Sequence, residues 1–324
     1  MKHSKGKIVR GLMVAVLLSI AATVCAADYP KRDITFIVPF GPGGGSDPIC
    51  RQFASQLEKA LGGNINIENK PGGSATIGIG AVVRAKPDGY TIGHATNSAL
   101  AYMPLVNRDL PYKTSDDYQS VVKQADMPYI LAVRADAPWK TFEDFMADVK
   151  KKPGKMRVSV SGMRTGPDLT MQLLNQVARV KIATVPFTGG AGEALIALLG
   201  GRVDAYASTG VGVVGHAQAG TVRVLAVFQK GKYDLFPGAT PVVDAGYNVS
   251  LPTMYSVIAP KGMPKDVLDK LVGTSLQVIR SEEYRKFAKA NGYVVDVKGP
   301  EAMKAELVQY GKTYADLIKF IEQK

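Results

Sequence analysis

The sequence predicts an α/β fold in two lobes, and two observations carry this prediction. Short runs rich in β-branched residues alternate with longer runs whose apolar residues recur every three or four positions. This alternation is typical of a mostly parallel sheet covered by helices. The same order of strand, glycine or hydroxyl turn, and helix occurs in both halves of the 324-residue chain. We therefore expect two lobes with a ligand cleft between them, because ligand sites favour domain interfaces.

The first predicted strand, residues 34–38, leads into a turn suited to bind an anion. The strand ends at Pro39, and Gly43 to Gly45 then allow left-handed backbone angles. We expect Asp47 to cap the following helix, whose first position is Pro48. Free main-chain amides and the helix dipole at such a turn both favour negative charge.

Two further strand ends in the first lobe carry small polar residues. A strand at 64–67 is followed by the glycine turn 71–74 and by a helix that must end before Pro87. A strand at 90–94 is followed by residues 95–98, which we expect to form a loop that caps another helix. Ligands bind beyond the carboxyl ends of the strands in open sheets of this type, so these strand ends form half of the predicted site.

A second lobe is predicted to begin near Met127, between strands at 120–124 and 129–134. Strands and helices then alternate: strands 156–160, 182–187, 203–207 and 222–228, and helices 141–152, 169–177 and 193–199. The strand ends at 161–168, 188–192 and 208–210 again hold glycines or hydroxyl side chains. These segments form the other half of the predicted site.

The last part of the chain is predicted to return to the first lobe. It contains a strand at 255–259 and helices at 265–280, 281–290 and 301–322. This return would make the first lobe discontinuous. The predicted division is domain 1 at 28–126 plus 232–324 and domain 2 at 127–231.

Residues 1–27 are predicted to be a signal peptide, which directs the protein to the periplasm. Four basic residues precede the apolar run 12–24, and Ala26 and Ala27 offer a cleavage site. The apolar run is shorter than the ~20 residues of a spanning helix. After cleavage 36 Lys and Arg remain against 28 acidic residues, a net charge of +8 that would draw in anionic solutes. Cys50 is then the sole cysteine, and we expect it to be a buried thiol.

Catalytic motifs are absent from the sequence. Ser46 stands where the dinucleotide fingerprint needs its third glycine, and neither a P-loop nor a Gly-x-Ser-x-Gly elbow occurs. His94 and His216 remain after cleavage, without metal-ligand spacing, and His94 is better explained as the end of a strand than as a ligand. We expect no enzyme activity, no cofactor and no metal site. Export and the lack of a Lys/Arg cluster also argue against nucleic acid as a partner.

Seven ordered motifs resemble a known family from about residue 29 to the end of the chain. The sequence is similar to the extracytoplasmic receptors of tripartite tricarboxylate transporters, often called the Bug family. The matching motifs are 37–47 (IVPFGPGGGSD, with Arg51 after it), 67–73 (IENKPGG), 77–78 (IG), 86–90 (KPDGY), 185–190 (VPFTGG), 199–204 (LGGRVD) and 223–226 (RVLA).

The resemblance implies a two-lobed, type II-like periplasmic-binding-protein fold with two mixed sheets, which closes over a small carboxylate. It implies a monomer that delivers its ligand to a membrane permease and carries out no reaction. Contacts would come from backbone amides, small hydroxyls and ordered waters. The implied first-lobe contacts are Phe40, Gly43, Gly44, Asp47, Gly73, Ser74, Thr76, Thr96, Asn97 and Ser98. The implied second-lobe contacts are Ser161, Thr165, Thr188, Gly189, Gly190, Asp204 and Ser208.

Some of these residues have structural explanations as well. Asp47 is better explained as a helix cap than as a ligand contact, since a carboxylate would repel an anion. Asp204 is expected behind the loop at Thr188, which it could orient. The loop at 162–168 departs from the family pattern, and Arg164 in it could hold a carboxylate bidentately or be solvated. Met163 and Pro167 add apolar surface to this loop, which suggests a ligand with a carbon skeleton or a ring.

Two other functions stay open from the sequence. The protein could be a periplasmic sensor that presents its closed form to a membrane signalling protein. It could also be a secreted hydrolase or transferase that holds phosphate at the glycine turn and depends on His94.

Overall fold

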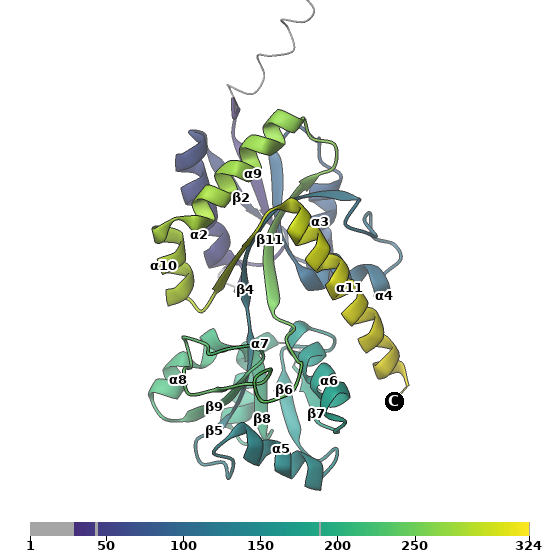
Figure 1. The fold of residues 1–324 in the computed structure, drawn as a ribbon, viewed down its shortest axis with the longest axis vertical. Helices are drawn as coiled ribbons and strands as arrows, with labels where there is room; N and C mark the ends of the chain where they lie inside the picture. Colours follow the sequence, from purple (N-terminus) through teal and green to yellow (C-terminus); the bar gives the residue numbers. More distant parts are fainter. Residues whose placement is uncertain (1–28, 43–44, 188, 324) are drawn as a thin grey trace, which may run out of the picture.

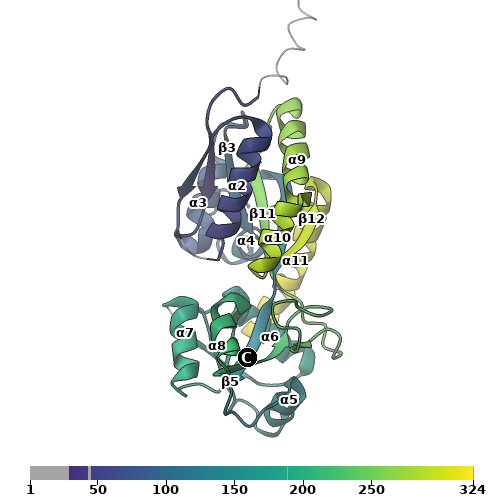
Figure 2. The same cartoon turned by 90° about the vertical axis from the view of Figure 1, so that its left-hand side faces the viewer.

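The computed structural model describes residues 29–42, 45–187 and 189–323, and it contains two six-stranded sheets (Figure 1). The proposed signal peptide, Gly43, Gly44 and Thr188 lie outside the described residues. The two lobes lie one above the other along the long axis and are joined by narrow segments (Figure 2). The predicted two-lobed α/β fold with two mixed sheets is confirmed.

The first sheet combines early and late parts of the chain. The order of its strands is β12 (Val294–Lys298), β4 (Tyr118–Met127), β11 (Thr253–Pro260), β3 (Thr91–Thr96), β1 (Ile34–Val38) and β2 (Ile65–Asn69). β1 pairs in parallel with β2 and β3, whereas β11 and β12 run antiparallel to their neighbours. The buried side chains alternate between the two faces of β1, because successive residues of a strand point to opposite sides.

The second sheet is formed by the middle of the chain. The order of its strands is β10 (Thr240–Pro241), β9 (Val222–Val227), β5 (Tyr129–Arg134), β8 (Ala205–Thr209), β6 (Arg157–Val160) and β7 (Ala183–Pro186). β6 pairs in parallel with β7 and β8, and β5 is antiparallel to β8 and β9.

Helices cover both faces of each sheet. In the first lobe α2 (Asp47–Leu61), α9 (Lys265–Arg280) and α10 (Glu282–Ala290) pack on one face. The other face is covered by α3 (Thr76–Val83), the π-helical turn η2 (Ser98–Tyr102) and α11 (Pro300–Glu322). The remaining helices are α4 (Met103–Val106), α5 (Phe142–Lys151), α6 (Gly166–Ala178), α7 (Gly190–Leu199), α8 (Val214–Gln218) and the short 3₁₀ turns η1 (Gly73–Ala75) and η3 (Gly210–Val213).

The chain crosses between the lobes twice along strands. Only Pro128 separates β4 of the first sheet from β5 of the second. β10 still belongs to the second sheet and β11 to the first, so the return lies between these two strands and after the predicted boundary at residue 232. We propose residues 242–252 for that boundary. α11 begins on the first lobe and its later part contacts α6 of the second (Figure 1).

Local sequence signals explain most helix ends, with two corrections. Thr141 and Asp144 form the capping box of α5, and Gly62 ends α2 at a φ of 73°. Asp47 is wrong as the cap of α2, because the helix already begins at Asp47 and Ser46 takes the N-cap position without a side-chain hydrogen bond. The expected loop at 95–98 is also wrong, because β3 continues to Thr96 through its pairing with β11. Cys50 is fully buried, as predicted.

Candidate ligand-binding cleft

A cleft of about 670 Å³ lies between the lobes, at the carboxyl ends of the parallel strands. Both lobes contribute to its lining, and so do the segments that join them. This is the position at which open α/β sheets bind their ligands.

The N-termini of three helices from both lobes meet at this cleft. Gly45 and Ser46 precede α2, Gly166 begins α6, and Gly190 begins α7. The first N–H groups of a helix have no partner within it, and the helix dipole places partial positive charge there. The arrangement therefore offers N–H donors to an anion from opposite sides of the cleft.

Hydroxyl groups add further donors and acceptors. The Thr96 and Ser98 hydroxyl oxygens lie 3.1 Å apart, and the Thr165 hydroxyl donates to the Gly162 carbonyl at 2.8 Å. Ser161 and Ser208 line the second-lobe side. Such groups orient a polar ligand without adding charge.

Aromatic and sulfur-containing side chains form the apolar wall of the cleft. Tyr129 and Tyr255 lie on strands that follow the crossings, and Phe40, Tyr102 and Met103 come from the first lobe. Burial raises the pKa of Tyr129 to about 12 and that of Tyr255 well above its usual range. Both hydroxyls are therefore neutral at physiological pH and can take part in hydrogen bonds.

Arg164 is the single charged side chain among the described residues that line the cleft. Its backbone has a φ of 57°, and its N–H donates to the Asp168 carboxylate at 2.7 Å. Its guanidinium interacts electrostatically with the hydroxyl of Tyr102 in the first lobe. Burial raises the pKa of Tyr102, and Arg164 acts in the opposite direction. Arg164 thus reaches across the cleft from the second lobe.

The structure brings about half of the sequence-predicted site residues to the cleft. Those that line it are Phe40, Ser74, Thr96, Ser98, Ser161, Arg164, Thr165, Gly190 and Ser208. The described residues that were predicted but do not line it are Asp47, Gly73, Thr76, Asn97, Gly189 and Asp204. The remaining three, Gly43, Gly44 and Thr188, lie outside the described residues. Contact of any of them with ligand stays a prediction.

Several of the residues outside the lining are held by structural hydrogen bonds. The Asp47 carboxylate pairs with Arg51 at 2.8 Å. Asn97 donates to the Pro252 carbonyl at 2.9 Å and accepts from the Met254 N–H at 3.1 Å, so it fixes the segment that enters β11. The Thr76 hydroxyl donates to the Gly73 carbonyl at 2.7 Å and closes the turn before α3.

Asp204 lies at the opposite end of its strand from the cleft. It directly precedes β8, and its carboxylate accepts from the Arg157 N–H at 2.7 Å. Ser208, four residues later, reaches the cleft, so the two are separated by ~13 Å along the strand. The expectation that Asp204 stands behind the loop at Thr188 is therefore not what the structure shows.

Some cleft residues were missed by the sequence reasoning. They are Gly41, Pro42, Gly45, Ser46, Tyr102, Met103, Tyr129, Gly166, Ala191, Thr209, Thr253 and Tyr255. The crossing near Met127 was a usable signal for Tyr129, because the crossing segments pass through the region between the lobes where the cleft lies. Thr253 and Tyr255 follow the return crossing in the same way.

His94 is buried beneath the cleft and does not line it. Its ring stacks on Tyr255 with centroids 5.4 Å apart. Burial lowers the pKa of His94 to about 3, while the Ser256 main chain acts in the opposite direction. The imidazole is therefore neutral and lies within β3, and it is not placed to act as a base on a ligand in the cleft.

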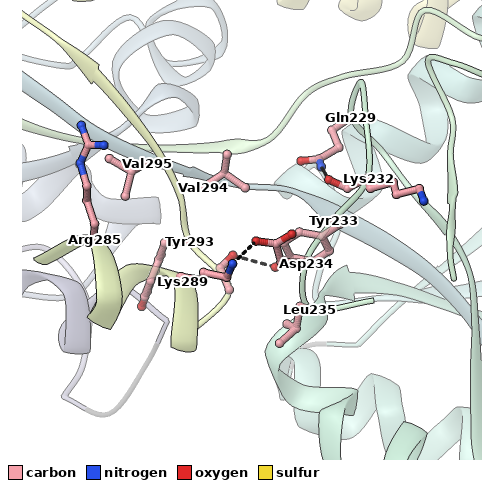
Figure 3. A pocket seen from close by; sticks show the side chains of 11 residues that line it. Gln229, Lys232, Tyr233, Asp234, Leu235, Arg285, Lys289, Tyr293, Val294 and Val295 are labelled. Atoms are coloured by element: carbon pink, nitrogen blue, oxygen red, sulfur yellow. Dashed lines mark hydrogen bonds and ion pairs between the residues drawn. The ribbon is translucent and has the colours of Figure 1, made fainter. Parts of the chain in front are cut away.

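A second cavity, of about 280 Å³, separates α10 and β12 from residues 229–235 of the second lobe (Figure 3). Lys289 and Asp234 form an ion pair of 3.1 Å across it, with both side chains mostly exposed. No N-terminus of a described helix lies among its lining residues. It lacks the convergent N–H donors that distinguish the cleft.

A buried charge cluster lies near the first crossing. The Lys123 ammonium is fully buried and donates to Asp126, Asp296 and Glu306, each at 2.7 Å. Oxygen atoms of the three carboxylates lie within 4.8 Å of one another, as in a cation site. The ammonium of Lys123 takes the place of the cation between them.

None of the described helices combines the length and the apolar character needed to cross a bilayer.

Comparison with known proteins gives consistent matches over most of the chain. A family profile described as tripartite tricarboxylate transporter family receptor matches residues 49–316. Protein BugT of Bordetella pertussis is 27% identical over 316 residues, which cover 95% of each chain. A Rhodopseudomonas palustris protein solved with adipate has a TM-score of 0.79 and 25% identity, over 90% of this chain and 98% of that one. MatC of the same species, solved with malate, has a TM-score of 0.74 and 25% identity, over 90% of this chain and 100% of that one.

Proposed function

The chain belongs to the tripartite tricarboxylate transporter receptor family, and from this premise we propose that it captures a small organic acid in the periplasm and delivers it to a membrane permease. Members of this family are periplasmic solute-binding receptors and generally not enzymes. The proposal adds three parts for this chain: the ligand class, capture by closure of the lobes, and delivery to the permease.

The observation that carries the ligand class is the meeting of three helix N-termini at one cleft. A carboxylate placed there can accept hydrogen bonds from the starts of α2, α6 and α7 at once. Arg164 supports this assignment, since a guanidinium and a carboxylate form charge-assisted, often bidentate hydrogen bonds. The malate and adipate found with the two similar structures are also carboxylates.

The apolar wall supports a ligand that has a carbon body as well as a charge. Phe40, Met103 and Met163 line the cleft beside the tyrosines, and Met163 is mostly exposed there. Burial of such surface against a ligand is favourable, at ~25 cal/mol per Å² of apolar area removed from water.

Closure of the lobes would be driven by contacts that exist only when both lobes reach the ligand. A ligand held by α2 of one lobe and by α6 and α7 of the other makes more hydrogen bonds in the closed form than in the open form. It therefore shifts the population toward closure by the difference in its affinity for the two forms. The permease would then recognise the closed form.

A thermal-shift screen tests the ligand class. The panel contains mono-, di- and tricarboxylates, aromatic acids and amino acids, with phosphorylated compounds of similar size for comparison. A ligand at 100 times its dissociation constant should add ~2.7 kcal/mol to the free energy of unfolding. We expect melting to shift with carboxylates. A shift with phosphorylated compounds alone, or no shift over the whole panel, would contradict the proposal.

A further inference from the structure

The turn between α10 and β12 is in contact with the second lobe. The Tyr233 hydroxyl of the second lobe donates to the Gly292 carbonyl at 2.7 Å, and Tyr233 is buried. Figure 3 shows Tyr233 and Asp234 on the second-lobe side of the second cavity, with Tyr293 and Lys289 on the first-lobe side. A Cβ atom at Gly292 would lie 2.7 Å from the Tyr233 hydroxyl oxygen. The turn is therefore closely seated against the other lobe.

The next residue, Tyr293, reaches the anion-binding turn at the start of α2. Its hydroxyl donates to the Gly45 carbonyl at 2.7 Å, and burial raises the pKa of this hydroxyl while the main chain of Ile49 acts to lower it. Ile49 is the third residue of α2, and its N–H has no partner within the helix. Ser46 makes no side-chain cap bond. Tyr293 thus holds the turn before α2 from outside the helix, through the Gly45 carbonyl.

Tyr293 is also packed against the wall of the cleft. Its ring meets that of Tyr255 edge to face, with centroids 5.4 Å apart and planes at 87°. Tyr255 and Gly45 line the cleft, whereas Gly292 and Tyr293 line the second cavity. Two consecutive residues therefore connect a contact between the lobes to the turn that would hold the ligand.

We infer that Gly292 and Tyr293 form a positioning element that couples the orientation of the second lobe to the N–H groups at the start of α2. A movement of Tyr233 relative to Gly292 displaces Tyr293, and this changes how its hydroxyl holds Gly45 at the start of α2. Tyr293 itself does not line the cleft, so it is a positioning residue and not a ligand contact. The inference rests on the proposed function only for the identity of the ligand.

The coupling must act in both directions. If the second lobe changes the anion-binding turn, an anion in that turn changes the preferred orientation of the second lobe by the same free energy. Ligand binding can thereby change the relative orientation of the lobes through Gly292 and Tyr293, in addition to its effect through ligand contacts across the cleft.

Hydrogen exchange on the purified, ligand-free protein tests this inference. We expect Tyr233→Phe in the second lobe to accelerate amide exchange at residues 49–51 of the first lobe by about fivefold, the factor that corresponds to one hydrogen bond of ~1 kcal/mol. Tyr293→Phe should do the same. The double variant should exchange no faster than Tyr293→Phe alone, because both substitutions interrupt one path.

Tyr29→Phe is the matched control. The Tyr29 hydroxyl donates to the carbonyl of Gly89 at 2.6 Å, Tyr29 is buried, and Gly89 has a φ of 86° in a turn of the first lobe. Tyr29→Phe removes the same kind of hydrogen bond at a place far from the contact between the lobes. It should leave amide exchange at residues 49–51 unchanged. Unchanged exchange in Tyr233→Phe, equal acceleration in Tyr29→Phe, or additive effects in the double variant would overturn the inference. The measurement needs no ligand, so it stays readable if carboxylates do not bind.

Discussion

The hydroxyl oxygens of Tyr129 and Thr253 lie 2.5 Å apart on the two segments that join the lobes. Tyr129 is the first residue of β5, directly after one crossing, and Thr253 is the first residue of β11, directly after the other. Both also line the cleft. This hydrogen bond joins the two crossing segments at the lining of the cleft.

Removing this hydrogen bond should loosen the connection between the lobes. We expect Tyr129→Phe to lower the free energy of unfolding by about 1 kcal/mol, the usual net contribution of one hydrogen bond. The two lobes should also vary more in their relative orientation, and this would appear as a wider distribution of distances between spin labels on the two lobes. Tyr112→Phe, which removes a 3.0 Å bond from a buried hydroxyl to the Ala99 carbonyl within the first lobe, is the control for stability alone. Identical distance distributions in the two variants would contradict the prediction.

Arg164 should determine how strongly the protein holds a carboxylate. We expect Arg164→Ala to weaken carboxylate binding by about tenfold, which corresponds to the ~1.5 kcal/mol of a hydrogen bond to a charged group. Arg164→Lys should restore binding in part, because an ammonium is a point charge without the planar fork. Isothermal titration with the best carboxylate measures both.

Arg157→Ala serves as the control for Arg164. This arginine is also exposed and belongs to the second lobe, but it pairs with Asp204 at the end of the sheet away from the cleft. Its removal should leave the affinity unchanged. If both arginine variants bind alike, Arg164 is a solvated loop residue.

Asn97 should matter for stability. Asn97→Ala would leave the Pro252 carbonyl and the Met254 N–H without their side-chain partner in a buried place. We expect the free energy of unfolding to fall by about 2–4 kcal/mol, the combined cost of leaving two buried polar groups unpaired. Urea denaturation measures this loss. If the variant keeps the stability of the parent protein but no longer binds the ligand, Asn97 contacts the ligand and its structural role is wrong.

The buried charge cluster should make stability depend on pH. Burial raises the pKa of Asp126 to about 6, whereas Lys123 acts to lower it and Glu306 and Asp296 to raise it further. An unfolded aspartate has a pKa near ~3.9. The folded protein therefore binds more protons than the unfolded chain between these values. The ionised carboxylate destabilises the fold above pH ~6, and this penalty is relieved as the pH falls toward ~4.

The pKa of Asp296 in the same cluster is shifted in the opposite direction, so its contribution to stability changes with pH in the opposite way. Its burial acts to raise its pKa, but Lys123 and Lys298 outweigh burial and lower it, so its contribution is present above pH ~4 and lost below. We expect the free energy of unfolding to rise on the order of 1 kcal/mol from pH 7 to pH 5. Asp126→Asn should flatten this rise in urea denaturation. Lys298, Glu306 and Tyr310 also face the cluster and could titrate with it. Equal slopes for the parent protein and the variant would therefore contradict the assignment of the rise to Asp126.

The regular elements of the fold could be predicted because their signals are local. Thr141 with Asp144, and Gly62 after Leu61, mark helix ends by the chemistry of neighbouring residues. β12 was missed because it is a short edge strand, and its pairing with β4 depends on the return of the chain. The extension of β3 through Thr96 has the same cause, since β11 supplies its partner from far along the sequence.

The candidate site could be predicted only where a glycine or hydroxyl turn follows a parallel strand. That rule found Ser74, Thr165 and Gly190. Asp204 was expected from the family resemblance alone, and it directly precedes β8, at the end of the strand away from the cleft. The rule failed for Tyr293, whose reach to Gly45 spans 248 positions of the sequence. Contacts of this kind depend on the packing of distant segments.

The division of the first sheet between distant parts of the chain has a consequence for the order of folding. β1, β2 and β3 cannot complete their sheet until β11 and β4 lie beside them, and β11 is synthesised long after β3. The second sheet uses strands from one continuous stretch, β5 to β10, so its loop-closure entropy is smaller. We expect the second lobe to form first and to act as a template on which the two halves of the first lobe then meet. Slow refolding should therefore be concentrated in β3 and β4, whose pairing with β11 waits for the last third of the chain.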